Sequence, residues 1–155
     1  METVGFDFGT TNSVMSIVTS DRIEGERCTP ILDEGYPHPS VVSYRGGRAI
    51  VGRRAKEELA NATSGVVGSI VRSPKTMLGR NSVTVDGHTY SPQVVVGDVV
   101  AHVMEHARQD RVARTTKNRF DRAVVTIPVD MNGERRRELR EACRDGRPQC
   151  LSIRS

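Results

Sequence analysis

The stretch that decides the fold is "VGFDFGTTNS", residues 4–13, in which an apolar strand ends at an acid and a glycine-led polar turn follows. A plain hairpin and a phosphate cradle both fit this pattern. A glycine lets the backbone approach a phosphate closely, and threonine hydroxyls and turn amides add donors. Asp7 can hold Mg²⁺ through its water shell. The turn residues are Gly9, Thr10, Thr11 and Asn12.

Composition sets broad limits on the class of protein. The 155 residues are 36% hydrophobic and 27% charged, enough for one globular domain or two small subdomains. Without a long apolar run or a secretory start, a cytoplasmic protein without a membrane partner is expected. The net charge of +4 comes with no tryptophan and only three Phe and three Tyr, so we expect no nucleic-acid partner. Cys28, Cys143 and Cys150 form no C-x-x-C pair and are expected to be reduced thiols.

Hydrophobic periodicity and turn residues predict alternating strands and helices. Strands are expected over 2–8, 14–19, 26–32, 41–44, 48–52 and 122–127, the last buried on both faces, with a hairpin around Asp86-Gly87. Helices are expected over 53–61 and 66–72, from Ser91-Pro92 onward with Val96, Val99, Val100, Val103 and Ala107 inward, and after an Asn132 cap with Leu139, Ala142 and Cys143 inward. This order favours an α/β unit interrupted by an inserted subdomain.

Six ordered segments resemble the DnaK-type heat-shock 70 kDa chaperones of the actin-like ATPase superfamily. They read "VGFDFGTTNSVMSIV", "HPSVVSY", "VGRRAKEE", "SPKTMLGR", "VDGHTYSP" and "AVVTIPVDMNGERRRELREA". The resemblance implies an α/β fold, lobe I of an actin-like (ribonuclease H-like) ATPase, with a mixed sheet, helices and an inserted α+β subdomain. Residues 1–37 and 118–155 would form the core ATPase subdomain, incomplete here, and 38–117 the insert.

The resemblance also assigns roles residue by residue. It makes Asp7 the acid that organises Mg²⁺ through water. Gly9, Thr10, Thr11 and Asn12 become the cradle for ATP or ADP, and Lys75 the catalytic lysine that stabilises the transferred phosphoryl group. Pro128 and Arg136 match a relay that carries nucleotide state toward a substrate-binding domain. Plain alternatives remain for three of these: a solvated loop lysine at 75, a strand end at Pro128 and a solvated arginine at 136.

The chain departs from the family pattern in four places. Thr76 stands where the family has arginine after the catalytic lysine, and Asp130 stands where it has an aromatic residue. The stretch between Arg80 and Asp86 is shorter than in typical members. After Gly146 the family pattern stops, so a truncation or frameshift near residue 146 is expected, with the second lobe absent and little or no hydrolysis by the chain alone.

A competing motif is His102-Val103-Met104-Glu105-His106, which spells H-x-x-E-H and matches a zinc-protease pattern. No histidine follows His106, and the valine stripe of the same helix centres elsewhere, so we expect a solvated pair on an exposed face. His38 and His88 suggest no site.

The expected function is therefore the N-terminal lobe of an ATP-binding chaperone, with Mg-ATP hydrolysis coupled to protein folding. Unfolded polypeptides and co-chaperones would be partners of the full-length parent. Two alternatives stay open: a non-catalytic remnant acting only as a binding module, and another phosphotransferase of the actin superfamily, such as a sugar kinase.

Overall fold

The computed structural model describes residues 3–21, 23, 25–61, 67–116, 120 and 122–145. A five-stranded mixed sheet forms its base, with the order β10-β1-β2-β3 and β4 paired to β2. β1 runs parallel to β10, and the other pairs are antiparallel. The strands are β1 (Val4–Phe8), β2 (Asn12–Asp21), β3 (Gly25–Ile31), β4 (His38–Pro39) and β10 (Ala123–Thr126).

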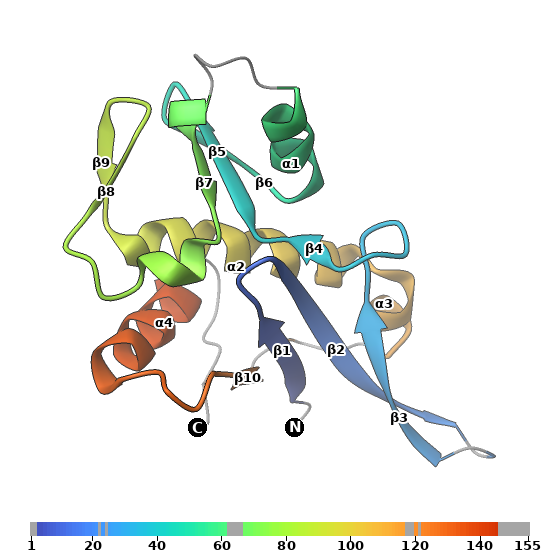
Figure 1. Ribbon diagram of the computed structural model, residues 1–155. Coiled ribbons are helices and arrows are strands. Elements are labelled where there is room, and N and C mark those ends of the chain that lie inside the picture. The colour runs from blue at the N-terminus through green and yellow to red at the C-terminus, as the bar shows by residue number, and fades with distance from the viewer. Residues whose placement is uncertain are drawn as a thin grey trace.

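A smaller sheet and a hairpin lie across the long helix α2 from the base (Figure 1). The sheet has the order β6-β5-β7, from β5 (Val41–Arg45), β6 (Arg48–Val51) and β7 (Ile70–Arg72). The hairpin joins β8 (Val83–Val85) to β9 (His88–Tyr90). The helices are α1 (Arg53–Ala60), α2 (Pro92–Gln109), α3 (Arg111–Thr116) and α4 (Gly133–Asp145), with 3₁₀ turns η1 (Val67–Ser69) and η2 (Pro74–Met77).

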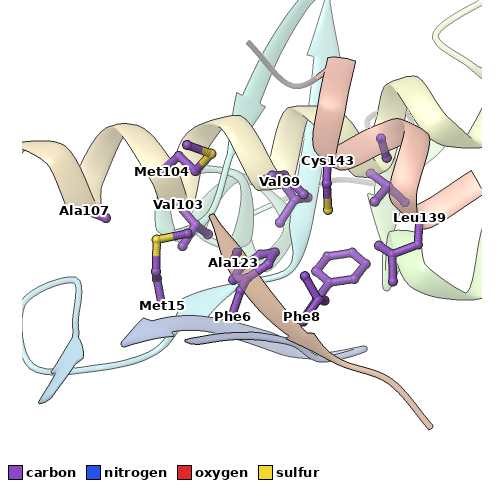
Figure 2. Packing of buried hydrophobic residues seen from close by; sticks show 14 of the residues in the cluster. Phe6, Phe8, Met15, Val99, Val103, Met104, Ala107, Ala123, Leu139 and Cys143 are labelled. Atoms are coloured by element: carbon purple, nitrogen blue, oxygen red, sulfur yellow. The ribbon is translucent and has the colours of Figure 1, made fainter. Parts of the chain in front are cut away.

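The core forms where α2 meets the base sheet and α4. Figure 2 shows Val99 and Val103 of α2 above Phe6 and Met15, with Leu139 and Cys143 of α4 beside them. The predicted inward stripe of α2 is confirmed, since all five of its residues are fully buried. The inward residues predicted for α4 are also buried: Leu139, Ala142 and Cys143. One continuous apolar cluster therefore joins the two sheets through α2.

The expectation of a helix over 66–72 is wrong in its described part. Residues 67–69 form only a 3₁₀ turn, and Ile70–Arg72 is strand β7, paired antiparallel with β5. β-Branched residues favour a strand once a partner edge is available, and β5 supplies that edge. Residue 66 lies outside the described residues.

The expectation that β10 is buried on both faces is also wrong. Its residues alternate, with Ala123 and Val125 buried and Val124 44% exposed. Within the described part of the chain, the inner face of β10 packs against the core, and β10 pairs with another strand, β1, along one edge only. The continuous apolar run in the sequence therefore predicted more burial than this strand has.

The predicted turns are confirmed. Gly46 and Gly47 both take positive φ between β5 and β6, and Asp86 and Gly87 do the same between β8 and β9, as a type I′ turn requires. Asn132 caps α4 by accepting the amide of Arg135 at 3.0 Å. The division of the chain into core and inserted subdomains stays a prediction. No helix in the described part of the chain is long and apolar enough to cross a membrane.

Candidate functional site

The opening motif forms the turn between β1 and β2. Phe8, the last residue of β1, pairs with Ser13 of β2, so Gly9, Thr10 and Thr11 make the connection and Asn12 begins the second strand. Thr10, Thr11 and Asn12 are exposed, while the flanking Phe8 and Ser13 are buried. Buried residues on both sides thus anchor a polar turn that faces solvent. We call residues 9–12 the phosphate turn, after the role that the sequence motif predicts for them.

Gly9 is required by the closeness of the backbone within this turn. A Cβ atom at this position would lie 2.2 Å from the carbonyl oxygen of Asn12, far inside van der Waals contact. The obstacle is backbone rather than a flexible side chain, so the turn would have to open to admit any other residue. Glycine is therefore needed at position 9 because the backbone of Asn12 lies too close to leave room for a side chain.

Lys75 lies beside the phosphate turn although 67 positions separate it from Phe8. Its Nζ donates a hydrogen bond to the carbonyl oxygen of Phe8 and lies 5.6 Å from the centre of the Phe8 ring. Burial lowers the pKa of Lys75 from its ordinary value, and the charge of Asp7 partly opposes that shift. Its neighbour Thr76 uses its hydroxyl locally, donating to the carbonyl oxygen of Ser73 at 2.8 Å.

Asp7 is exposed near the end of β1, on the strand that leads into the turn. Thr126 of the parallel strand β10 donates its hydroxyl to Oδ1 of Asp7 at 2.6 Å. This contact spans 119 positions and depends on the register that pairs Asp7 with Thr126. It fixes one carboxylate oxygen and leaves the other available to solvent or an ion. The motif gave no role to Thr126, and the register between two distant strands was needed to find it.

Ser40 is the second residue that sequence reasoning missed. Its hydroxyl donates to the carbonyl oxygen of Gly9 at 3.0 Å and shares a 2.9 Å hydrogen bond with the hydroxyl of Ser13. Its amide donates to Thr11 at 2.8 Å, and its carbonyl accepts the amide of Ser73 at 3.2 Å. Ser40 thus links the phosphate turn to the segment that carries Lys75. The available signal was its place in the "HPSVVSY" segment.

Pro128 lies in the loop between β10 and α4, and Arg136 of α4 bonds to that loop. Pro128 follows β10 by two residues and is exposed. Arg136 donates from Nε to the carbonyl oxygen of Met131 at 2.7 Å and from a terminal nitrogen to Val129 at 3.5 Å. The side chain of Arg136 therefore holds the loop between β10 and α4 through these two carbonyl oxygens. The relay role of both residues stays a prediction.

The histidines overturn another expectation. His102 and His106 of α2 are half-buried rather than solvated, and the ring of His38 packs against both of theirs. The three ring centres lie 5.6 Å apart for His38–His102 and 5.0 Å apart for the other two pairs. His38 itself is fully buried in the short strand β4. In the described residues, no group of three His, Cys, Asp or Glu side chains is arranged to hold a metal ion.

The turn has the donors that a phosphate and Mg²⁺ need. Exposed hydroxyls at Thr10 and Thr11, a backbone cradle that a Cβ at Gly9 would fill, and a nearby ammonium all suit phosphate oxygens. Mg²⁺ keeps several waters and takes one or two carboxylates together with substrate phosphates. Asp7 is one such carboxylate, and Thr126 holds one of its two oxygens by a hydrogen bond. The residues present therefore fit both groups.

Comparison with known proteins identifies the family of the chain. The family model for Hsp70 protein matches residues 3–146. Chaperone protein DnaK of Mycoplasma mycoides is 29% identical over 146 residues, covering 90% of this chain and 22% of the relative. Chaperone protein DnaK of Thermus thermophilus is 28% identical over 179 residues, covering 97% of this chain and 26% of the relative. The chain thus spans about a quarter or less of these curated relatives, and it belongs to the Hsp70 protein family.

Proposed function

We propose that this chain forms the phosphate-binding half of an Mg-ATP site in a DnaK-type chaperone. The observation that carries the proposal is the convergence of Lys75 on the phosphate turn next to Asp7, from a segment 67 positions away. Membership in the Hsp70 family supports the same reading. A sugar kinase of the same superfamily is disfavoured, because the match to the Hsp70 model runs through the Lys75 segment.

Each residue then has a separate task. The amides and hydroxyls of residues 9–12 hold the β- and γ-phosphate oxygens. Lys75 places a positive charge beside the γ-phosphate, where it stabilises charge on the transferred phosphoryl group and orients the attacking water. Asp7 orders the water shell of the ion, whose contribution when bound is to neutralise phosphate charge. Pro128 and Arg136 would relay the nucleotide state of the site toward a substrate-binding domain.

The wider role follows from the family and is part of the same proposal. In full-length DnaK-type chaperones we expect nucleotide turnover to control the capture and release of unfolded polypeptides in the cytoplasm, with co-chaperones as partners. The chain by itself would bind Mg-ATP and hydrolyse it slowly or not at all, since phosphoryl transfer needs the nucleotide enclosed from both sides.

The second candidate is a non-catalytic binding module. The observation that favours it is the hydrogen bond from Lys75 to the Phe8 carbonyl, which satisfies the ammonium within the protein. In this alternative Lys75 stabilises the turn through this bond and does not bind a nucleotide phosphate. The two candidates differ in what Lys75 does for stability and for nucleotide affinity.

Calorimetric titration with Mg-ATP separates them. Asp7→Asn and Lys75→Gln should each weaken binding about tenfold or more, and EDTA should weaken binding to the unaltered chain. Asp86→Asn and Arg72→Gln are matched controls, because both remove the same charge from exposed positions and should leave affinity unchanged. Lys75→Gln should change thermal stability little.

No binding of Mg-ATP at about 1 mM by the folded chain would refute the proposal and favour the binding module. A Lys75→Gln variant that unfolds more easily but binds as tightly as the unaltered chain would do the same. Binding that survives EDTA and Asp7→Asn unchanged would remove the metal role from Asp7 while leaving the phosphate turn in place.

A further inference from the structure

His38, which is fully buried, and the half-buried His102 and His106 pack together behind the phosphate turn, and we call them the histidine cluster. His38 pairs with Ser13, and Pro39 pairs with Asn12, so the strand that carries His38 is bonded to the strand that begins at the turn. The other two rings come from successive turns of α2. The cluster therefore joins the short strand β4 to the central helix of the molecule.

The ring of His38 is buried without hydrogen bonds from the described residues to offset the loss of water. The residue is fully buried, and neither ring nitrogen has a hydrogen-bond partner among the described residues. A neutral imidazole in this position leaves a donor and an acceptor unpaired, which is already unfavourable. A charged imidazole is far more so, because a buried cation needs a partner that holds its charge.

The groups around His38 add to that cost. His102 and His106 from α2 and Arg53 from α1 all disfavour a positive charge on the ring, and Asp33 alone favours it. Asp33 is already paired with Arg53 at 3.2 Å, and Glu34 lies 3.5 Å from the same guanidinium. Burial is the largest cause, and together these groups lower the pKa of His38 from 6.5 to about 4.

The backbone at the start of α1 packs closely against one ring of the cluster. Nε2 of His102 is buried without a partner in the described residues and lies against Gly52, where a Cβ would stand 2.6 Å from it. Gly52 is itself buried with φ of 76°, and the start of α1 therefore packs closely against the ring of His102. Burial also lowers the pKa of His102. Protonation of His38 in this place therefore favours any movement of β4 away from α2 that exposes the ring to water.

We propose that the histidine cluster is an acid-sensitive latch: protonation of His38 releases residues 38–40 from α2 and with them the hydrogen bonds that hold the phosphate turn. The released bonds are those of Ser40 to Gly9, Thr11 and Ser73. The opening itself needs no nucleotide. Its effect on ligand affinity rests on the proposed function above, and the two are tested separately below.

The sign of the effect follows from the lowered pKa. The open form has an ordinary imidazole and binds the proton more tightly than the closed form, so closure is complete above pH 6.5 and is lost as the pH falls toward about 4. Between pH 7.5 and pH 5 the opening equilibrium should rise about thirtyfold from His38 alone.

Amide hydrogen exchange on the whole chain is the test. Protection of the Ser40 and Ser73 amides, both bonded across the latch, should fall about thirtyfold from pH 7.5 to pH 5 in the unaltered chain. The amide of Val4, bonded to Arg122 between β1 and β10, should keep its protection. His38→Gln should abolish most of the change. His88→Gln is the matched control, since His88 is exposed and should leave the change intact.

An equal loss of protection at Val4, Ser40 and Ser73 would overturn the latch, because it would report global unfolding. So would a loss that persists in His38→Gln. If that variant does not fold, the imidazole titration of the unaltered chain decides: a His38 pKa near 6.5 overturns the proposal, and one below about 5 supports it. A chain that fails to bind Mg-ATP at pH 7.5 refutes the proposed function, and the exchange experiment still decides the latch.

Discussion

The front and the back of the phosphate turn are both built from polar residues, yet they are built differently. At the front, Asp7 and Thr126 form their 2.6 Å hydrogen bond at the surface. At the back, Ser13 is 1% exposed, and Ser40 and His38 are fully buried. Water can replace a lost surface bond but not a buried one. The back should therefore decide the shape of the turn, and the front should decide what the turn binds.

The largest effect should come from the turn itself. Gly9→Ala places a Cβ 2.2 Å from the Asn12 carbonyl oxygen, and such overpacking costs about 2–3 kcal/mol. Mg-ATP affinity should fall about 100-fold, because an opened turn would move the amides and hydroxyls that are proposed to hold the phosphates. Gly5→Ala is the control, since its Cβ meets nothing closer than 3.8 Å. Urea unfolding and calorimetry measure both, and a Gly9→Ala variant that binds normally would contradict the cradle.

Ser40→Ala tests the back of the turn. It removes hydrogen bonds to Gly9 and Ser13 in a fully buried place, and we expect a loss of about 2 kcal/mol in the free energy of unfolding. Ser91→Ala is the control, because Ser91 is exposed at the N-cap of α2 and makes no side-chain cap bond. Equal losses in the free energy of unfolding in the two variants would contradict the view that the buried back of the turn decides its shape.

The charge of Lys75 gives a pH-dependent prediction for the front. Since burial lowers its pKa, the ammonium loses its proton below the ordinary value of 10.5. Mg-ATP affinity should fall about fivefold, or about 1 kcal/mol, as the pH rises from about 8 to 10. The unfolded chain binds more protons in this range, so Lys75 makes the folded state more stable as the pH rises, and unfolding does not explain the loss. Lys75→Gln should show a flat profile, and an equal fall in that variant would contradict the assignment.

The smallest effect should come from Thr126→Val. The variant frees Oδ1 of Asp7, but the site is exposed, so we expect a stability change below about 1 kcal/mol and an affinity loss of about threefold. Thr84→Val, on the exposed face of the β8–β9 hairpin, is the control. A stability loss as large as that of Ser40→Ala would show that the front also shapes the turn.

Most of the fold was predictable because the signals were local. The inward valines of α2 repeat at helical spacing, the Asp86-Gly87 turn needs two residues that tolerate positive φ, and Asn132 supplies a cap at short range. The exceptions were positions where a distant partner decided the outcome. Ile70–Arg72 became a strand because β5 offered an edge, and Val124 stayed exposed on the outer face of β10.

The sequence by itself determined the turn, its glycine, its acid and the family to which they point, since these depend on residue type and short spacing. Only the tertiary structure decided that Lys75 reaches Phe8, that Thr126 holds Asp7 and that three histidines gather behind the turn. Such contacts join residues up to 119 positions apart. Strand register and helix packing create them, and neither is encoded in the neighbours of any one residue.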